Sequence, residues 1–320
     1  MSSRRDNNNT RLDDAARAGW LYYIAGNTQD EIAAKLGISR QSAQRMVSLA
    51  VSEGLVKVRL DHPIANCLEL ASQLKKQFGL RFAEVVPTDP ASLSTTLGVA
   101  EAGAEEMARW LKSPEPIIMA IGTGRTLKAA IEQLSPMECP QHKVVSLTGN
   151  IAPDGSAAFY NVIFNIADAI HARSFPMPLP VIASSPEERE LLHAQAMIRP
   201  VLELAAKADV TFLGIGDLGD DAPLFLDGFV SQVELKALQK AGGVGEILGW
   251  SFDSEGRMLE GLTNERVASA PIPSGGNSLI IALAKGAKKQ PAIAAAVKGR
   301  LVNGLITDEA TAAALLKREI

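Results

Sequence analysis

From residue 82 onward, the chain alternates short apolar runs with amphipathic helical patterns, and this alternation restricts the fold more than any other feature. Apolar runs of this length are typical of strands that are buried on both faces. Helices between such strands favour a mostly parallel sheet that is covered on both sides. We therefore predict a large α/β domain with strands at 82–87, 116–122, 143–149, 209–216, 246–252, 279–284 and 301–307, and helices at 92–112, 126–134, 158–171, 186–207, 231–241, 289–298 and 307–318.

The length and composition fit a two-domain globular protein. With 320 residues the chain has room for about two domains, and its 47% hydrophobic content is ordinary for a globular chain. The longest apolar runs, such as 279–284, are too short to span a bilayer, and the polar residues 1–10 lack the apolar centre of a secretory signal. Two cysteines and four scattered histidines offer no disulfide framework and no metal-ligand spacing. These features predict a cytoplasmic protein without a membrane segment, a structural metal or a cofactor.

Charge is distributed unevenly along the chain. Residues 1–60 hold nine Lys and Arg against six Asp and Glu, which gives this segment a net charge of +3. Because the whole chain carries −4, the remaining residues carry −7. A small basic head on an acidic body suits local contact with phosphates.

The basic head has the pattern of three short helices joined by tight turns. A first helix is expected at 11–25, a second from the cap residue Thr28 to about Leu36, and a third at about 40–53. A glycine after the second helix supplies the positive φ that a tight turn requires. A DNA-binding helix-turn-helix has the same spacing of small and apolar residues, which here are Ala33, Gly37, Ala43 and Met46.

The third helix of the head carries a polar face of arginine, glutamine and serine, whereas a solvated face more often carries Glu and Lys. Arg and Gln hydrogen-bond base edges and phosphates, so we predict that this face enters the major groove of DNA. A generic three-helix cap would explain the helices but not this face. Residues 54–60 are expected to form the strand of a short wing. The candidates for DNA contact, which include two helix caps, are Thr28, Ser39, Arg40, Gln41, Ser42, Gln44 and Arg45.

Glycine-rich loops follow several predicted strands, at the end of the sheet where ligands bind in folds of this kind. Residues 122–126, "GTGRT", begin a helix, and their backbone N–H groups, hydroxyls and guanidinium predict an anion cradle. The loop lacks the Lys-Ser/Thr ending of a P-loop, which argues against ATP. Further polar loops lie at 147–150, 214–217 and 242–249, and each alone is explained equally well as a plain tight turn. Together the four loops predict a site for a small polar ligand.

The order of these motifs resembles the SorC family of bacterial sugar-responsive transcriptional regulators. The resemblance rests on the basic head, "GTGRT", "GIGD", "GVGE" before "GWSFDSEG", and above all the C-terminal "KKQPAIAAAVKGRLVNGLITDEATAAALL". It covers nearly the whole chain. The resemblance implies an effector domain related in fold to sugar-phosphate isomerases and glucosamine-phosphate deaminases. It also implies a dimer or tetramer whose DNA binding is altered by a small sugar, polyol or sugar phosphate.

The resemblance also assigns effector contacts to this chain. The 122–126 loop matches the phosphate-side loop of the family, Glu246 an acidic sugar contact, and Lys289 a lysine that reaches the ligand. Lys285 stands where the family usually has a glycine, so either the ligand approaches differently there or Lys285 contributes a charge. With polar residues of the other loops, the candidate effector contacts are Gly122, Thr123, Gly124, Arg125, Thr126, Asn150, Asp217, Glu246 and Lys289.

The predicted organisation is a helix-turn-helix domain at 1–60, a linker helix at 61–80 and an effector-binding and oligomerisation domain at 81–320. The predicted function is a DNA-binding regulator of a carbohydrate or polyol catabolic operon. Its partners would be double-stranded operator DNA, a small effector and further copies of the chain.

An alternative is a sugar-phosphate isomerase or deaminase with an accessory head. Its general base would come from Asp217, Asp220 or Asp221, and its ring-opening group from His171 or His193. No arrangement in the sequence ties these residues together. A scaffold without a ligand would leave the glycine-rich loops and Lys289 unexplained.

Overall fold

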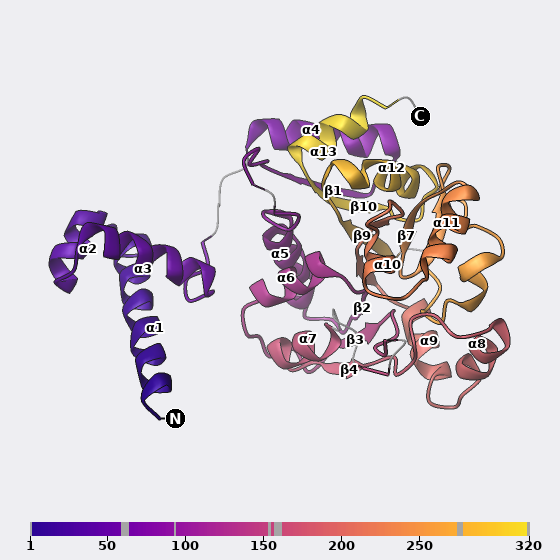
Figure 1. Ribbon diagram of the computed structural model, residues 1–320, viewed down its shortest axis with the longest axis horizontal. Helices are drawn as coiled ribbons and strands as arrows, with labels where there is room; N and C mark the ends of the chain where they lie inside the picture. The colour runs from indigo at the N-terminus through magenta and orange to yellow at the C-terminus, as the bar shows by residue number, and fades with distance from the viewer. Residues whose placement is uncertain are drawn as a thin grey trace. The chain divides into compact units, whose positions relative to one another are not determined.

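The computed structural model describes residues 2–58, 64–92, 94–152, 155–156, 162–273 and 278–318. They belong to two compact units, Met1–His62 and Pro63–Ile320. Figure 1 shows helices alone in the first unit and a sheet flanked by helices in the second. None of the described helices is both long and apolar enough to cross a membrane.

The first unit consists of α1 (Ser2–Tyr23), α2 (Gln29–Leu36) and α3 (Arg40–Ser52). A capping box starts α2, in which the Thr28 hydroxyl accepts the Glu31 amide and the Glu31 carboxylate accepts the Thr28 amide at 2.8 Å. Gly37 ends α2 in the left-handed region, with φ of 64°, as the turn was predicted to require. The buried residues that join the three helices are Ala18, Ile32, Ala33, Ala43 and Val47.

Two expectations for the first unit were wrong. Helix α1 begins at Ser2, well before residue 11, and residues 2–10 contain no glycine or proline that would end it. Residues 54–58 form turns and irregular structure where the strand of a wing was expected. Residues 59 and 60 of that expected strand lie outside the described residues.

The second unit contains a seven-stranded sheet in which every strand pair is parallel, as the alternation of strands and helices predicts. The register pairs Ala120 with both Thr211 and Val145, so the centre of the sheet is aligned across three strands. In spatial order the strands are β1 (Phe82–Val86), β10 (Gly304–Asp308), β9 (Leu279–Leu283), β5 (Val210–Leu213), β2 (Ile118–Ile121), β3 (Lys143–Ser146) and β4 (Arg173–Phe175).

Helices cover both faces of this sheet (Figure 1). Side chains alternate along each strand, so Met119 and Ile121 belong to one hydrophobic cluster and Ala120 belongs to the other. The first cluster packs beneath α5 (Val99–Leu111), α6 (Arg125–Gln133) and α7 (Ile163–Ile170). The second packs beneath α4 (Ala65–Phe78), α9 (Arg199–Ala206), α12 (Gln290–Lys298) and α13 (Glu309–Leu316).

Helix α4 is part of the second unit. Its buried residues Cys67, Ala71 and Leu74 recur every three to four positions and face β1 and α13. The helix that the sequence assigns to a linker at 61–80 therefore contributes to the core of the α/β unit. Residues 59–63, which precede it, lie outside the described residues.

A small antiparallel sheet was not predicted. The segment expected as one strand at 246–252 is instead a hairpin of β7 (Gly243–Ile247) and β8 (Trp250–Asp253), and β6 (Gly216–Asp217) pairs with β7. The turn residues Leu248 and Gly249 have φ of 57° and 88°, as a two-residue hairpin turn of this hand requires.

Other differences concern helix ends and short elements. The helix expected at 186–207 is broken into α8 (Pro186–His193) and α9, and Pro200 lies in the first turn of α9. Gly98, with φ of 79°, delays the start of α5. Strand β4 has only three residues and was missed. The remaining elements are α10 (Pro223–Leu226), η1 (Leu262–Arg266), α11 (Gln232–Lys240) and η2 (Ala287–Lys289).

Candidate functional site

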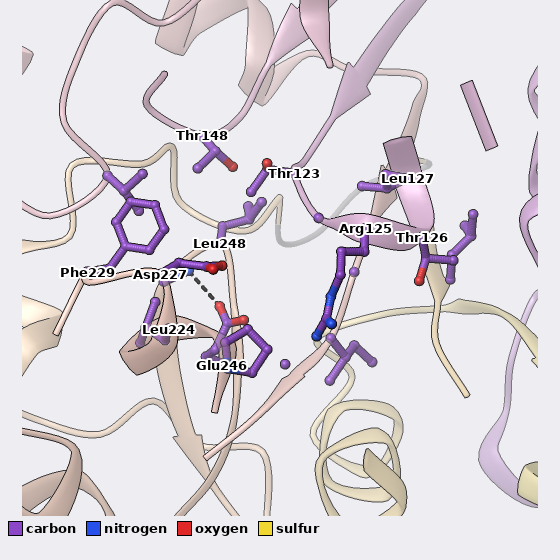
Figure 2. A pocket seen from close by; sticks show the side chains of 18 of the residues that line it. Thr123, Arg125, Thr126, Leu127, Thr148, Leu224, Asp227, Phe229, Glu246 and Leu248 are labelled. Carbon is purple, nitrogen blue, oxygen red and sulfur yellow. Dashed lines mark hydrogen bonds between the residues drawn. The ribbon is translucent and has the colours of Figure 1, made fainter. Parts of the chain in front are cut away.

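A cavity of about 130 Å³ lies at the carboxyl ends of β2, β3, β5 and β9, where parallel α/β sheets bind their ligands. Figure 2 shows side chains from the loops after these strands and from the small antiparallel sheet around the same space. Its lining residues include Thr123, Gly124, Arg125, Thr126, Thr148, Gly214, Gly216, Asp227, Phe229, Glu246, Leu248 and Lys289.

The 122–126 loop forms the wall at the end of β2. The Gly122 amide donates to the Phe212 carbonyl at 2.8 Å, which fixes the loop to β5. Gly124 then turns the chain into α6 with φ of 126°, and a side chain there would meet no atom within 4 Å. The first amides of a helix lack acceptors within that helix, so the start of α6 offers N–H donors to the cavity. Arg125, at the first position of α6, extends toward Glu246 (Figure 2).

The opposite wall is acidic. Glu246 of β7 lies directly over Gly216, because a Cβ atom at Gly216 would come within 2.1 Å of Glu246 Oε1. Its Oε2 accepts the Gly249 amide at 2.8 Å, which fixes the carboxylate against the hairpin turn. Figure 2 shows that Asp227 approaches the same space from the side of Phe229.

Burial perturbs the pKa values of the charged groups around this cavity. It raises the pKa of Glu246, and the nearby negative charge of Asp217 adds to that rise, whereas the Gly249 amide and Lys289 oppose it. Burial also raises the pKa of Asp227, against the opposing influence of Arg125. Lys289 has a lowered pKa, again mainly because it is buried. Two cations and three carboxylates therefore interact within one cluster, as sites that act on ligands often show.

Thr148 offers a hydroxyl that no described residue uses. Its side chain lines the cavity and is only 3% exposed. Within the described parts of the chain, its buried Oγ1 has no hydrogen-bond partner. An unsatisfied buried hydroxyl is costly, so this atom is suited to bond with a polar ligand.

In the first unit, α3 presents the predicted polar face to solvent. Gln41, Gln44 and Arg45 are exposed, whereas Ala43 and Val47 on the other side of the helix are buried. Arg40 is also exposed, and its Nε lies 3.5 Å from a carboxylate oxygen of Asp30. Two of the predicted DNA contacts, Thr28 and Ser39, are helix caps. The Thr28 hydroxyl accepts the Glu31 amide at the start of α2, and the Ser39 hydroxyl accepts the Ser42 amide at the start of α3.

Comparison with known proteins identifies the family. Residues 62–317 match a family described as "Putative sugar-binding domain". The erythritol catabolism regulatory protein EryD of Brucella abortus is 34% identical over 302 residues, which cover 94% of this chain and 96% of that protein. The transcriptional regulator LsrR of Escherichia coli K12 is 32% identical over 318 residues, covering 95% of each chain. The full-length sorbitol operon regulator SorC of Klebsiella pneumoniae has a TM-score of 0.70 at 25% identity, over 96% of this chain and 99% of that one.

The chain belongs to the SorC family. It is a sugar-responsive transcriptional regulator, and its second unit is the sugar-binding domain of that family. The domain match begins at residue 62, which agrees with the boundary between the two compact units.

The structure brings together six of the nine predicted effector contacts of this SorC-family chain: Thr123, Gly124, Arg125, Thr126, Glu246 and Lys289 line the cavity. Gly122 is not among the lining residues, and its amide donates to the Phe212 carbonyl of β5. Asp217 does not line the cavity, although its charge influences Glu246 and Lys289. Asn150 is not among the lining residues, and its backbone amide donates to the Met177 carbonyl at 3.2 Å.

Other cavity residues of this SorC-family domain were not predicted. Asp227 and Phe229 follow α10, between the 214–217 and 242–249 loops, and Thr95 lies in the segment between β1 and α5. Lys285, where the chain departs from the family, is not among the lining residues. Its Nζ donates to the Leu97 carbonyl at 3.0 Å instead.

Proposed function

We propose that the first unit is a helix-turn-helix domain whose helix α3 reads operator DNA in the major groove. The proposal is supported by the capped α3, by the glycine turn at residue 37, and by the exposed Arg and Gln side chains on one face of the helix. A bacterial chain that binds operator DNA acts in the cytoplasm. Because operators are commonly paired half-sites, we further propose that the working form is a homo-oligomer, with a dimer as the minimum.

The effector is, in this proposal, a small sugar or polyol that carries a phosphate. The observation that carries the proposal is the convergence of the α6 N-terminus, Arg125 and the unpartnered Thr148 hydroxyl on one cavity. The helix N-terminus and the guanidinium would hold the phosphate, since both favour an anion. Glu246, Asp227 and Lys289 would bond to hydroxyl groups. Bound effector would alter DNA affinity and so control a carbohydrate or polyol catabolic operon.

A second candidate is an unphosphorylated polyol. Two carboxylates, Glu246 and Asp227, line the cavity, and their negative charge disfavours a dianion but suits hydroxyl donors. The name of EryD connects that relative with erythritol catabolism, which makes erythritol and erythritol 4-phosphate the natural pair of probes. The two probes differ only in the phosphate ester that erythritol 4-phosphate carries on one terminal hydroxyl.

Calorimetric titration of the full chain with these two probes tests the effector proposal. If the phosphate is held as proposed, erythritol 4-phosphate binds more tightly than erythritol, and Arg125→Ala weakens it roughly ten- to a hundredfold, the loss of one charge-assisted hydrogen bond. Lys128→Ala is the matched control, because Lys128 lies one turn further along α6 and does not line the cavity. Thr148→Val, which removes only the hydroxyl, should weaken both probes.

Equal affinity for the two probes, together with normal binding by Arg125→Ala, would reject the phosphate and leave the neutral polyol.

We also propose that the protein is not an enzyme. Asp220 and Asp221, nominated as bases, are exposed and form ion pairs with Lys236 and Lys288. His193 Nε2 donates to the Ala268 carbonyl at 2.9 Å, and His193 is not among the residues that line the cavity. Turnover of sugar phosphates by the purified protein would contradict this part of the proposal.

A further inference from the structure

The segment between β1 and α5 connects the effector cavity with α4. It comprises residues 87–92 and 94–98, and we refer to these residues as the strap. Thr95, within the strap, lines the cavity. In the described part of the strap, the amides of Thr96 and Leu97 both donate to Ser94 Oγ, so the middle of the strap bonds within itself. Its position therefore depends on how its two ends are held.

Lys285 holds the end of the strap that lies near the cavity. Its Nζ donates to the Leu97 carbonyl at 3.0 Å and lies 3.9 Å from Asp308 Oδ2. The Lys285 side chain is 8% exposed and that of Asp308 is 7% exposed. Both side chains are buried, so the Lys285 Nζ has little freedom to leave these two partners. Asp308 also caps α13, because its Oδ1 accepts the Thr311 amide at 3.0 Å.

Glu309 holds the other end. Its Oε2 accepts the Thr88 amide at 3.2 Å, and Thr88 Oγ1 in turn accepts the Ala310 amide at 3.0 Å. The second carboxylate oxygen, Oε1, accepts from Asn66 Nδ2 at 2.6 Å. Asn66 lies in the first turn of α4, the first helix after the boundary between the two units. One carboxylate thus joins the strap to α4.

We propose that the strap couples the effector cavity to α4, with Thr95 as a further effector contact, Lys285 as the residue that positions it, and Glu309 as the junction with α4. The inference rests on the proposed effector site. Effector contact with Thr95 would favour one position of the strap, and the Glu309 carboxylate would pass that preference to the start of α4. Helix α4 is the first helix after the boundary between the two units, so its start is the part of the sugar-binding domain nearest in the chain to the DNA-binding unit. Coupling of this kind requires an effector that favours one position over the other.

Hydrogen exchange of the full chain without any effector tests the connection directly. Asn66→Ala removes one bond at an exposed position, so exchange at the strap amides of Ser94, Thr96 and Leu97 should accelerate roughly two- to tenfold. Gln73→Ala is the matched control, because Gln73 lies in the same helix and its Nε2 donates to Glu69, one turn away in that helix, at 2.8 Å. Unchanged strap exchange in Asn66→Ala would overturn the proposal.

Lys285 is tested in the same way. Lys285→Met should accelerate exchange at the same strap amides, whereas Lys288→Met, an exposed neighbour paired with Asp221, should not. If Lys285→Met does not fold, Lys285→Arg preserves the charge and is expected to restore slow exchange only partly, because the longer side chain must fit the same buried space. Strap exchange that matches the unsubstituted chain in both variants contradicts the role of Lys285.

A second experiment tests the effect on DNA binding. It measures the affinity of the full chain for a duplex selected from random DNA, with and without erythritol or erythritol 4-phosphate. Thr95→Ala should weaken the tighter probe by several-fold. Asn66→Ala should bind that probe normally yet lose at least half of its effect on DNA affinity. A full DNA response in Asn66→Ala overturns the coupling. If neither probe binds the unsubstituted chain, the proposed effector class is wrong, while the exchange experiment still decides whether the strap is joined to α4.

Discussion

At the scale of single residues, Glu84 carries the clearest pH dependence. Burial beside α5 raises its pKa to about 7, helped by Glu106 and Glu105 and opposed by Arg109. A raised pKa means that the folded state prefers the protonated carboxyl, so the stabilisation is complete below about pH 4.5 and is lost as the pH rises through 7. Glu84→Gln should therefore raise the free energy of unfolding at pH 8 by about 1–2 kcal/mol, discounted for partial exposure, and change it little at pH 5.

Urea unfolding at the two pH values measures this difference. The exposed Glu115, changed to Gln, serves as the control and should give the same small change at both. A Glu84→Gln variant with equal effects at pH 5 and pH 8 would mean that the carboxylate is already ionised and well solvated in the folded protein.

A second residue-scale prediction concerns Gly216. A methyl group there would come within 2.1 Å of Glu246 Oε1, so Gly216→Ala must displace that carboxylate and should cost about 1–3 kcal/mol of stability. Gly214→Ala is the control. Its added methyl would meet the Thr123 carbonyl oxygen at 3.5 Å, which is ordinary van der Waals contact and not a clash. Its cost should stay near 0.5 kcal/mol. Thermal or urea unfolding compares the two, and equal costs would refute the steric argument.

Residue types predicted part of the cavity and missed the rest for a physical reason. The 122–126 loop was identifiable because glycines directly after a buried strand have few purposes other than a tight turn or close approach of a ligand. Asp227 was not, because nothing local distinguishes it from Asp220 and Asp221. Those two are exposed and ion-paired, whereas Asp227 faces the cavity. Only packing of the segment against the sheet separates them.

At the scale of elements, substitutions on α3 test the proposed recognition helix. Arg40→Ala or Arg45→Ala should weaken binding to the selected duplex without changing stability, because both side chains are exposed. A lost phosphate contact lowers affinity on all sequences and reduces the slope of log affinity against log salt by about one, whereas a lost base contact costs roughly 1–3 kcal/mol at one position. Gel-shift titrations at several salt concentrations distinguish these outcomes.

Arg17→Ala provides the comparison for α3, since it removes the same charge from an exposed position of α1. If Arg17→Ala weakens binding as much as the α3 variants do, general electrostatic attraction explains the result and α3 is not the recognition helix.

Elements with strong periodicity were predicted well, and those fixed by tertiary pairing were not. Six of the seven strands of the parallel sheet lie within apolar runs bounded by helical patterns, so they were anticipated. The missed strand, β4, has three residues at the edge of the sheet, too few to show a pattern. The β7–β8 hairpin was read as one strand because its turn contains Leu248, a residue that rarely adopts positive φ. The Leu248 side chain is buried and lines the cavity, so the residue with this uncommon positive φ lies at the candidate site.

At the scale of the whole molecule, the packing of α4 onto the second unit is a feature that its sequence pattern does not specify. An amphipathic helix between two domains has the same pattern whether it links them or packs onto one of them. Here Cys67, Ala71 and Leu74 are buried against the sheet, so α4 is the first core element of the second unit. The apolar face alone could not reveal which partner it meets.

The last prediction concerns the division of labour between the units. The first unit has its own buried core, so a fragment of residues 1–60 should fold, remain monomeric and bind the selected duplex about 10²–10⁴-fold more weakly than the full chain. The loss arises because the second half-site contact is no longer held at high effective concentration. Light scattering and gel-shift titration measure both properties. Trp20 and Ile24 are 55% and 69% exposed on the first unit and would be the natural contact if the fragment dimerised. A tight dimer of the fragment that binds DNA as the full chain does would place oligomerisation in the head, against the assignment of that role to the sugar-binding domain.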